Sequence, residues 1–180
     1  MNLDLTGKNA IVCGSTQGIG KAAAIELSLL GASVTLVARD EQKLKHVWGE
    51  LHHSGHQFHH HLAVDFSQPE AVRKKMNEHM QKHAVHILVN NTGGPPGGLA
   101  IDAKPEEFLA AFTSHLICNQ IITQAVVPSM KSEKYGRIIN IISTSVKIPI
   151  RALGVSNTIV VRWRTGQKHF LLSWLPLASR

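Results

Sequence analysis

Three glycines near the N-terminus, Gly14, Gly18 and Gly20, are the residues whose spacing points most directly to chemistry. They lie in N-A-I-V-C-G-S-T-Q-G-I-G, residues 9–20, between a short apolar run and an Ala-rich stretch, 21–30, that favours a helix. A strand, a glycine turn and a helix in succession bring a bound phosphate to the N-terminus of the helix. Gly14 then allows a sharp turn, Gly18 a close approach of the backbone to a pyrophosphate, and Gly20 close packing of the helix on the strand.

The spacing of these glycines is G-x-x-x-G-x-G rather than the more general G-x-G-x-x-G. An ordinary glycine turn in an α/β protein is the alternative interpretation, because glycine motifs of this kind also occur by chance.

The elements that must position this loop follow from the alternation of apolar runs and helix-favouring segments. Strands are expected at residues 10–13, 33–38, 59–65, 86–90 and 136–143. Helices are expected at 21–30, 41–54, 69–83 and 105–130, with Gly31 at the C-terminal cap of the first. Such alternation implies right-handed βαβ units, and so predicts a Rossmann-like α/β fold in which a doubly wound parallel sheet lies between two layers of helices.

Two of the expected helices carry apolar residues at helical spacing, and these are core candidates. They are Leu44, Val47 and Leu51 in the second helix, and Phe108, Phe112, Leu116 and Ile122 in the fourth.

Composition limits the classes of protein to which the chain can belong. Its 180 residues are 43% hydrophobic, enough for one domain with a sizeable core. No apolar run approaches the roughly 20 residues that span a membrane, and residues 1–8 lack the apolar segment of a signal peptide. Cys13 and Cys118 lie in apolar surroundings without CxxC spacing, so we expect reduced, buried thiols and a cytoplasmic location.

The net charge of +7 raises the question of nucleic-acid binding. Residues 160–180 hold four basic side chains and no acid, and without them 15 basic and 12 acidic side chains leave a net charge of +3. Because the body of the protein is only mildly basic, we expect no nucleic-acid partner. The terminal L-L-S-W-L-P-L segment is too short to span a membrane, so we expect no membrane partner either.

Seven histidines fall between residues 46 and 61, including His59, His60 and His61. Clustered imidazoles can bind metal, but no cysteine or paired carboxylate completes a ligand set here. We expect a solvated helix end and strand entry with adventitious affinity for nickel or zinc, and no native metal site.

Four further segments, together with the glycine loop, give residues 5 to about 159 a resemblance to the short-chain dehydrogenase/reductase family. They are Asp65, N-N-T-G at 90–93, T-Q-A-V-V-P-S-M at 123–130 and R-I-I-N-I-I-S at 137–143. The resemblance implies that Asp65 hydrogen-bonds the adenine of a dinucleotide and that 90–93 lines the cofactor site. It also implies that 123–130 ends a long interface helix and that 137–143 delivers a catalytic serine.

The resemblance implies a set of cofactor-binding residues around the glycine loop. They are Gly14, Ser15, Thr16, Gly18, Ile19, Gly20, Arg39, Asp65, Asn91 and Gly93. An acid at the end of the second strand would bind the ribose 2′-hydroxyl of NAD. This strand ends at Ala38-Arg39 instead, and a guanidinium suits the 2′-phosphate of NADP through bidentate, charge-assisted hydrogen bonds. We therefore expect NADP(H) rather than NAD(H); a solvated arginine is the alternative.

The catalytic positions depart from the family pattern of Asn, Ser, Tyr and Lys. In that pattern the tyrosine exchanges a proton with the substrate oxygen, the lysine lowers the tyrosine pKa and the serine orients the carbonyl. Ser143 keeps the serine position, but Ser156 stands at the tyrosine position and Val160 at the lysine position. His115 aligns with the asparagine. The only tyrosine, Tyr135, precedes the fifth strand, so we do not expect reduction at the rate typical of the family.

The character of the sequence changes after Ile159, where the family would continue its catalytic helix. One base inserted into a plausible coding sequence after Ile159 restores the reading I-R-G-A-V-A-N-W-A-K, an Ala-rich amphipathic helix similar to this family. We hypothesise that residues 1–159 are an incomplete NAD(P)-binding domain without the last strands of its sheet. Residues 160–180 would then be an aberrant, frameshifted tail.

The resemblance implies an NADP(H)-dependent oxidoreductase acting on a carbonyl/alcohol pair, with a 3-oxoacyl thioester as one candidate substrate. It also implies a homo-oligomer. Loss of the last strands would expose apolar surface and a sheet edge, which favours aggregation or low stability. A catalytically inactive dinucleotide-binding protein and a non-functional truncated gene product are the alternatives.

Overall fold

The computed structural model describes residues 3–159, which form two compact units. The first unit contains Met1–Gly93 and Ile117–Ile141, and the second contains Gly94–Leu116 and the residues from Ile142 onward. The division of the sequence into a domain over 1–159 and a tail over 160–180 stays a prediction, because the tail lies outside the described residues.

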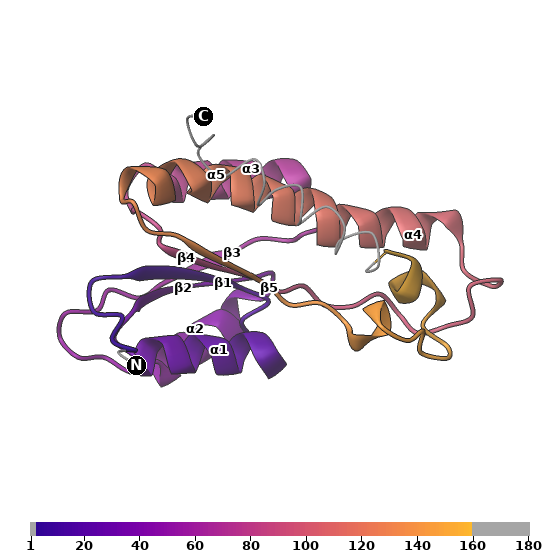
Figure 1. Cartoon of the computed structure of the whole chain (residues 1–180), viewed down its shortest axis with the longest axis horizontal. Helices are drawn as coiled ribbons and strands as arrows, with labels where there is room; N and C mark the ends of the chain where they lie inside the picture. The colour runs from indigo at the N-terminus through magenta and orange to yellow at the C-terminus, as the bar shows by residue number, and fades with distance from the viewer. Residues whose placement is uncertain (1–2, 160–180) are drawn as a thin grey trace, which may run out of the picture. The chain divides into compact units, whose positions relative to one another are not determined.

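A parallel sheet forms the centre of the first unit (Figure 1). Its strands are β1 (Asn9–Cys13), β2 (Ser33–Ala38), β3 (His60–Ala63), β4 (Ile87–Asn90) and β5 (Arg137–Asn140), in the order β3-β2-β1-β4-β5. On one face lie α1 (Gly18–Leu29) and α2 (Glu41–Glu50), and on the other α3 (Pro69–Met80) and α5 (Cys118–Ser132). The predicted Rossmann-like, doubly wound α/β fold is therefore confirmed for this unit.

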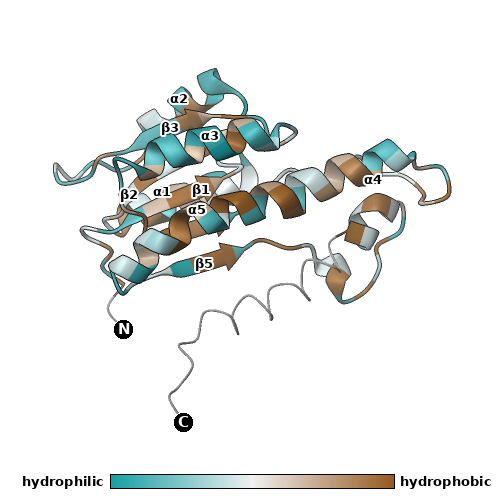
Figure 2. Cartoon of the chain, turned by 90° about the horizontal axis from the view of Figure 1, so that it is seen from above, coloured by the Kyte–Doolittle hydropathy of each residue, from teal (hydrophilic) through white to brown (hydrophobic). Residues whose placement is uncertain are grey.

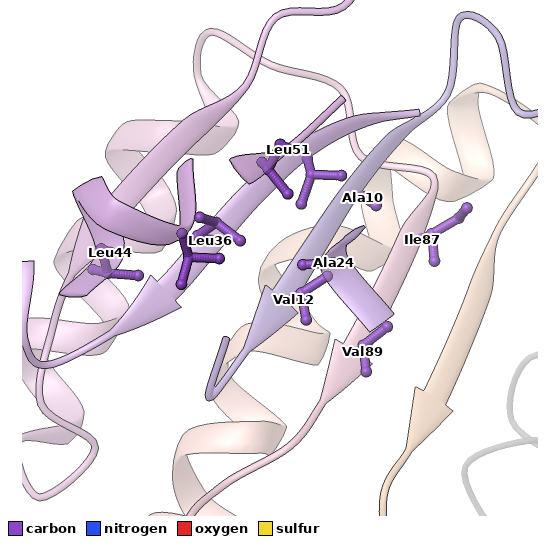
Figure 3. Packing of buried hydrophobic residues seen from close by; sticks show 10 residues of the cluster. Ala10, Val12, Ala24, Leu36, Leu44, Leu51, Ile87 and Val89 are labelled. Atoms are coloured by element: carbon purple, nitrogen blue, oxygen red, sulfur yellow. The ribbon is translucent and has the colours of Figure 1, made fainter. Parts of the chain in front are cut away.

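The core under α1 and α2 comes from alternate residues of the strands, because successive side chains of a strand point to opposite faces. Figure 3 shows side chains of β1, β2 and β4 meeting those of α1 and α2. They include Ala10, Val12, Ala24, Leu36, Leu44, Leu51, Ile87 and Val89. The predicted core residues of the second helix, Leu44, Val47 and Leu51, are thus confirmed.

The opposite face is covered by α3 and α5. Hydrophobic residues run along α5 in Figure 2, and Ile122, Val126 and Met130 of this helix are buried. From α3, Val72 and Met76 are buried as well. With both faces covered, the strands can be apolar on both sides, as the sequence of β1 is.

The second unit contains α4 (Pro105–Phe112), which continues through a π-helical turn at Thr113–Ile117. It also holds a short 3-10 helix at Thr144–Val146 and a helical turn over residues 154–159. Its apolar cluster consists of Ala111, Val155 and Ile159, with Ala103, Phe108 and Leu116 packed against them.

The helix predicted over 105–130 is present, but a π-helical turn at Thr113–Ile117 interrupts its regular α geometry between α4 and α5. Of its core candidates, Ile122 is fully buried and Phe108 and Leu116 are partly buried, but Phe112 is 41% exposed. The extra residue that a π turn accommodates changes which side chains face inward, and the sequence periodicity did not show it.

The helix predicted over 41–54 ends early, at Glu50. Leu51 adopts an extended conformation, with ψ of 146°, and the next residue, His52, donates its backbone N–H to Ser28 Oγ at 3.0 Å. A tertiary hydrogen bond to α1 thus replaces the last turn of the expected helix. The first helix, conversely, begins at Gly18 rather than at Lys21.

The prediction of a solvated histidine cluster is wrong for His59. This side chain is only 7% exposed, whereas His46, His52, His53 and His56 are exposed, as expected. Among the described residues, no group of three or more His, Cys, Asp or Glu side chains is placed to hold a metal ion.

Both cysteines are buried and unbridged, as predicted. Burial raises the pKa of the Cys13 thiol to about 12 and that of Cys118 to about 11, so both stay protonated and unreactive at neutral pH. Within residues 3–159, the helices are too short or too polar to cross a lipid bilayer.

Replacement of Leu36 in the centre of β2 should destabilise the fold strongly. Leu36 is fully buried, so Leu36→Ala leaves a cavity and should lower the free energy of unfolding by about 2–5 kcal/mol. Leu29→Ala, on the 55% exposed end of α1, is the matched control and should change it by less than about 0.5 kcal/mol. Urea unfolding followed by circular dichroism measures both, and equal losses would contradict the described core.

Candidate functional site

The order of the strands creates a natural ligand site at the carboxyl ends of β1 and β4. From β1 the chain moves outward through β2 to β3 and then crosses back to β4 on the other side of β1. In open α/β sheets, ligands bind at the carboxyl ends of the strands where the winding direction reverses. Gly14 follows β1 and Asn91 follows β4. Both belong to the set of residues predicted from the sequence to bind a cofactor.

Gly14 and Gly20 fit together so closely that no side chain could stand between them. A Cβ at Gly20 would lie 2.2 Å from the Gly14 carbonyl oxygen, and one at Gly14 would lie 2.6 Å from the Asn91 carbonyl oxygen. Gly14 also has a positive φ of 60°, which side chains disfavour. Both positions therefore require glycine, because a side chain would collide with backbone. This agrees with the close helix packing predicted for Gly20 and with the sharp turn predicted for Gly14.

Asn91 links the loop after β4 to the loop after β1. Its Nδ2 lies 3.3 Å from the carbonyl oxygens of both Cys13 and Gly14 and donates to them. The side chain therefore holds the glycine turn against the end of β4.

Gly18 is different, because a Cβ there would have no heavy atom within 4 Å in the described part of the chain. It starts α1 with a positive φ of 56°. The N-cap residue Gln17 makes no side-chain hydrogen bond to the first turn, and the turn contains no acidic residue. The N–H groups and positive dipole end of α1 are therefore open to a ligand phosphate, and the space at Gly18 lets it approach the backbone.

The neighbouring loop residues differ in their surroundings. Ser15 is fully buried, and its Oγ accepts from the backbone N–H of Val37 in β2 at 3.0 Å. Thr16 is partly exposed, and Ile19 is 62% exposed beside the open N-terminus of α1. Ser15 thus fastens the loop to the sheet, while Thr16 and Ile19 are accessible to a ligand.

Arg39 and Asp65 follow neighbouring strands at the same edge of the sheet. Ala38 of β2 pairs with Ala63 of β3, so Arg39 comes directly after one strand of a parallel pair and Asp65 comes two residues after the other. Both are exposed, and Asp65 Oδ1 accepts from Ser67 N at 2.8 Å. An exposed cationic residue and an exposed anionic residue thus follow neighbouring strands at this edge of the sheet.

Asp40, next to Arg39, interacts with Lys43 at the start of α2. Its Oδ1 accepts from Lys43 N at 3.0 Å as the N-cap of α2, and its Oδ2 lies 3.6 Å from Lys43 Nζ. Hydrogen bonding to the Lys43 backbone lowers the pKa of this carboxyl, and the lysine offsets its charge. Asp40 is therefore engaged with α2, and Arg39 is the exposed charged residue directly after β2.

The candidate catalytic residues lie in the second unit, apart in the sequence from the cofactor candidates. Ser143 Oγ accepts from Ser145 N at 3.1 Å and caps the 3-10 helix. Ser156 is partly buried in the helical turn over 154–159, and Val160 lies outside the described residues. His115 lies in the π-helical turn, where burial lowers the pKa of its imidazole, so the ring is neutral at pH 7.

One group of polar residues near the site comes from the segments 90–93, 123–130 and 137–143, but the sequence reasoning did not predict the hydrogen bonds that join them. Asn90 at the end of β4 is buried, and its Nδ2 donates to Asn140 Oδ1 at 2.8 Å and lies 3.4 Å from Thr123 Oγ1. Together these side chains tie β4, β5 and α5 to one another. The signal available was the presence of single asparagines in otherwise apolar strands, because a buried amide needs partners.

A family model for short chain dehydrogenase matches residues 8–155 of the chain. The chain is 37% identical over 141 residues to a protein named ketoacyl reductase 1 of the granaticin polyketide synthase from Streptomyces violaceoruber, covering 77% of this chain and 52% of that protein. It is 33% identical over 141 residues to a 3-oxoacyl-acyl-carrier-protein reductase of Pseudomonas aeruginosa, covering 77% of this chain and 56% of that protein. The chain thus spans about half the length of the curated relatives it matches.

Solved structures match the fold over nearly all of the chain. The L-sorbose reductase of Gluconobacter frateurii, complexed with NADPH and L-sorbose, is 25% identical with a TM-score of 0.89, over 96% of this chain and 66% of that one. A metagenomic short-chain oxidoreductase in complex with NADP is 32% identical with a TM-score of 0.83, over 94% of this chain and 77% of that one.

The matched residues, 8–155, contain the glycine loop, all five strands of the sheet and the segments on which the resemblance was based. The agreement covers most of the chain in both sequence and fold. The chain therefore belongs to the short-chain dehydrogenase/reductase family of oxidoreductases.

Proposed function

We propose that the chain binds NADP(H) and belongs to an oxidoreductase that acts on a carbonyl/alcohol pair, with 3-oxoacyl thioesters as the leading substrate class. The observation that carries this proposal is the preformed cradle between β1 and α1. There, close backbone packing at Gly14 and Gly20 is combined with open space at Gly18 and an uncapped helix N-terminus. A dinucleotide pyrophosphate is the ligand that such a cradle suits.

NADP(H) is favoured over NAD(H) by the charges at the end of β2. Arg39 is exposed, and its neighbour Asp40 is engaged as the cap of α2. A free carboxylate there would bind the ribose hydroxyls of NAD, whereas a guanidinium pairs with a 2′-phosphate. The NADP and NADPH complexes of the solved relatives agree with this choice.

The substrate class is inferred from the relatives. Two of them carry names of ketoacyl or 3-oxoacyl reductases, whose substrates are 3-oxoacyl thioesters. The L-sorbose reductase is a relative with a sugar substrate, so a polyol or ketose is the class to compare in the same assay.

When bound, the nicotinamide supplies the hydride chemistry. Ser143 would orient the substrate carbonyl, since its Oγ accepts from Ser145 N while its own O–H can still donate. Neutral His115 offers one donor and one acceptor at the position of the family asparagine. Ser156 would be a weak proton donor, because an aliphatic hydroxyl is far less acidic than a phenol.

The serine at position 156 favours a second candidate, a dinucleotide-binding protein without turnover. A general acid matched to its task contributes about 10²–10⁴ in rate, and a serine hydroxyl supplies little of this. Binding of NADPH without oxidation of NADPH by 3-oxoacyl thioesters would favour this candidate over the reductase.

Substitution of Gly20 should abolish the cradle. In Gly20→Ala the new methyl group meets the Gly14 carbonyl, so α1 must shift, and NADPH affinity should fall at least about tenfold. Gly49→Ala, inside α2 with nothing within 4 Å of its Cβ in the described part, is the matched control. It should keep the affinity and raise stability by about 0.5–1 kcal/mol. NADPH fluorescence titration and thermal unfolding measure both.

Removal of the Arg39 guanidinium should reduce the preference for NADPH. Arg39→Ala loses charge-assisted hydrogen bonds, so the Kd for NADPH should rise about ten- to a hundredfold while that for NADH changes about twofold at most. Arg73→Ala removes another exposed arginine, on α3, and should alter neither constant. Equal weakening of both nucleotides in Arg39→Ala would refute the proposed 2′-phosphate contact.

Restoring the family's proton donor should restore the rate. The double variant Ser156→Tyr, Val160→Lys is expected to raise kcat for NADPH oxidation by a 3-oxoacyl thioester about a hundredfold, with the Kd for NADPH unchanged. Addition of Ser143→Ala to this variant should remove most of the gain. Absorbance of NADPH during turnover provides the measurement, and a wild-type chain already as fast as the double variant would show that another residue donates the proton.

A further inference from the structure

Strand β2 is held by histidine side chains at its amino end. The backbone N–H of Val34 donates to His59 Nδ1 at 2.9 Å, and His59 Nε2 lies 2.8 Å from the His52 carbonyl oxygen. The next residue of the strand, Thr35, has its Oγ1 3.2 Å from His79 Nε2. Because Nδ1 of His59 accepts and Nε2 must donate to a carbonyl, this ring is the neutral Nε2–H tautomer.

Three further ring contacts link His60 of β3, His79 of α3 and His83, which follows α3. The ring centroids of His60 and His79 are 5.8 Å apart, those of His60 and His83 4.4 Å, and those of His79 and His83 4.6 Å. His60 lies in β3, opposite Thr35 of β2, and His79 is only 7% exposed. Four histidines, His59, His60, His79 and His83, thus surround the pair of strands at the edge of the sheet.

The titratable groups facing these rings are themselves mostly histidines. His52 and His53 act on His59; His59, His61 and His83 act on His60; and His60 and His83 act on His79. On α2, Glu41 is paired with Lys45 at 3.0 Å, and His61 and Lys75 also act on this carboxylate. Protonation of more than one of the rings would therefore place like charges side by side in a partly buried site.

We propose that His59, His60 and His79 form an acid-sensitive latch that closes the β2–β3 edge of the sheet only while these three rings are neutral. A proton on His59 Nδ1 would face the Val34 N–H, so two donors would oppose each other where one hydrogen bond now exists. A proton on His79 would place a charge in a buried site. Below neutral pH, the latch opens and β3 separates from β2.

The direction of the pH effect follows from burial. Burial lowers the pKa of His59 and His60, and lowers that of His79 to about 4 from its usual 6.5. The unfolded or opened edge therefore takes up protons between about pH 6.5 and pH 4 that the closed edge excludes. The stability contributed by the neutral rings is fully present above pH 6.5 and is lost as the pH falls through this window.

The latch also acts on the cofactor site, a consequence that rests on the proposed function. Arg39 follows β2 and Asp65 follows β3, and these strands are paired up to Ala38 and Ala63. Separation of the strands would move the two side chains apart, so acidification should weaken NADPH binding as well as the sheet edge.

Hydrogen exchange followed by mass spectrometry, corrected for intrinsic rates, tests the latch on the purified chain. The opening constant of the peptides that contain β2 and β3 should rise about tenfold for each pH unit between about pH 6 and pH 5. His59→Asn and His79→Gln each keep an acceptor near its present place but take up no proton in this range. Each variant should make the opening constant depend less steeply on pH. His56 is an exposed histidine of the same loop, and His56→Gln should leave the pH dependence unchanged.

His86, whose Nδ1 accepts from Asn9 N of β1 at 3.0 Å, is kept in every variant, so its own titration is common to all. An unchanged pH dependence in both His59→Asn and His79→Gln would overturn the latch, as would equal flattening in His56→Gln. Wild-type exchange that is equally protected at about pH 7 and pH 5 would overturn it without any variant.

NADPH titration over the same range separates the latch from the proposed function. The wild-type Kd should rise with acid more steeply than that of His79→Gln, and protonation of the 2′-phosphate itself affects both chains alike. If NADPH fails to bind at neutral pH, the proposed function fails, whereas the exchange experiment still decides the latch.

Discussion

The contact between Gly20 and the Gly14 carbonyl is the constraint on which the remainder of the site depends. Any side chain at either position would collide with backbone, so α1 can pack against β1 only as these residues allow. That packing fixes the direction of the N-terminus of α1. It also leaves Gly18 without a neighbouring heavy atom within 4 Å of a Cβ position in the described residues. Asn91 then ties the turn to β4, so the strand that follows the crossover also defines the cradle.

Local rules explain why the glycine turn, the five strands and the parallel sheet were predictable from the sequence. Gly14, Gly18 and Gly31 all have positive φ, and each occupies a turn or helix end where a glycine is favoured. Two features were not predicted from the sequence, the burial of His59 and the π-helical turn around His115. The burial of His59 depends on Val34 and His52, and the π-helical turn around His115 leaves no periodic signal in the sequence.

The residues proposed for the cofactor and those proposed for catalysis fall in different compact units. All the residues proposed for the cofactor precede Gly94, whereas Ser143, Ser156 and His115 belong to the other unit. Binding and chemistry can therefore be lost separately, because the cradle is assembled without any side chain from the second unit. The glycine turn before α1 is therefore formed although Ser156 stands at the position that the resemblance assigns to the tyrosine.

The role of Asp40 as the cap of α2 affects how cofactor preference could change in evolution. An acid already stands beside Arg39, but its oxygens are engaged with Lys43. Recruiting this carboxylate to a ribose would uncap α2, at a cost of about 1 kcal/mol. A lineage moving from NADP to NAD would avoid this cost by placing a new acid at position 39 itself. The residue proposed to select the cofactor and the residue that starts the helix can therefore vary independently.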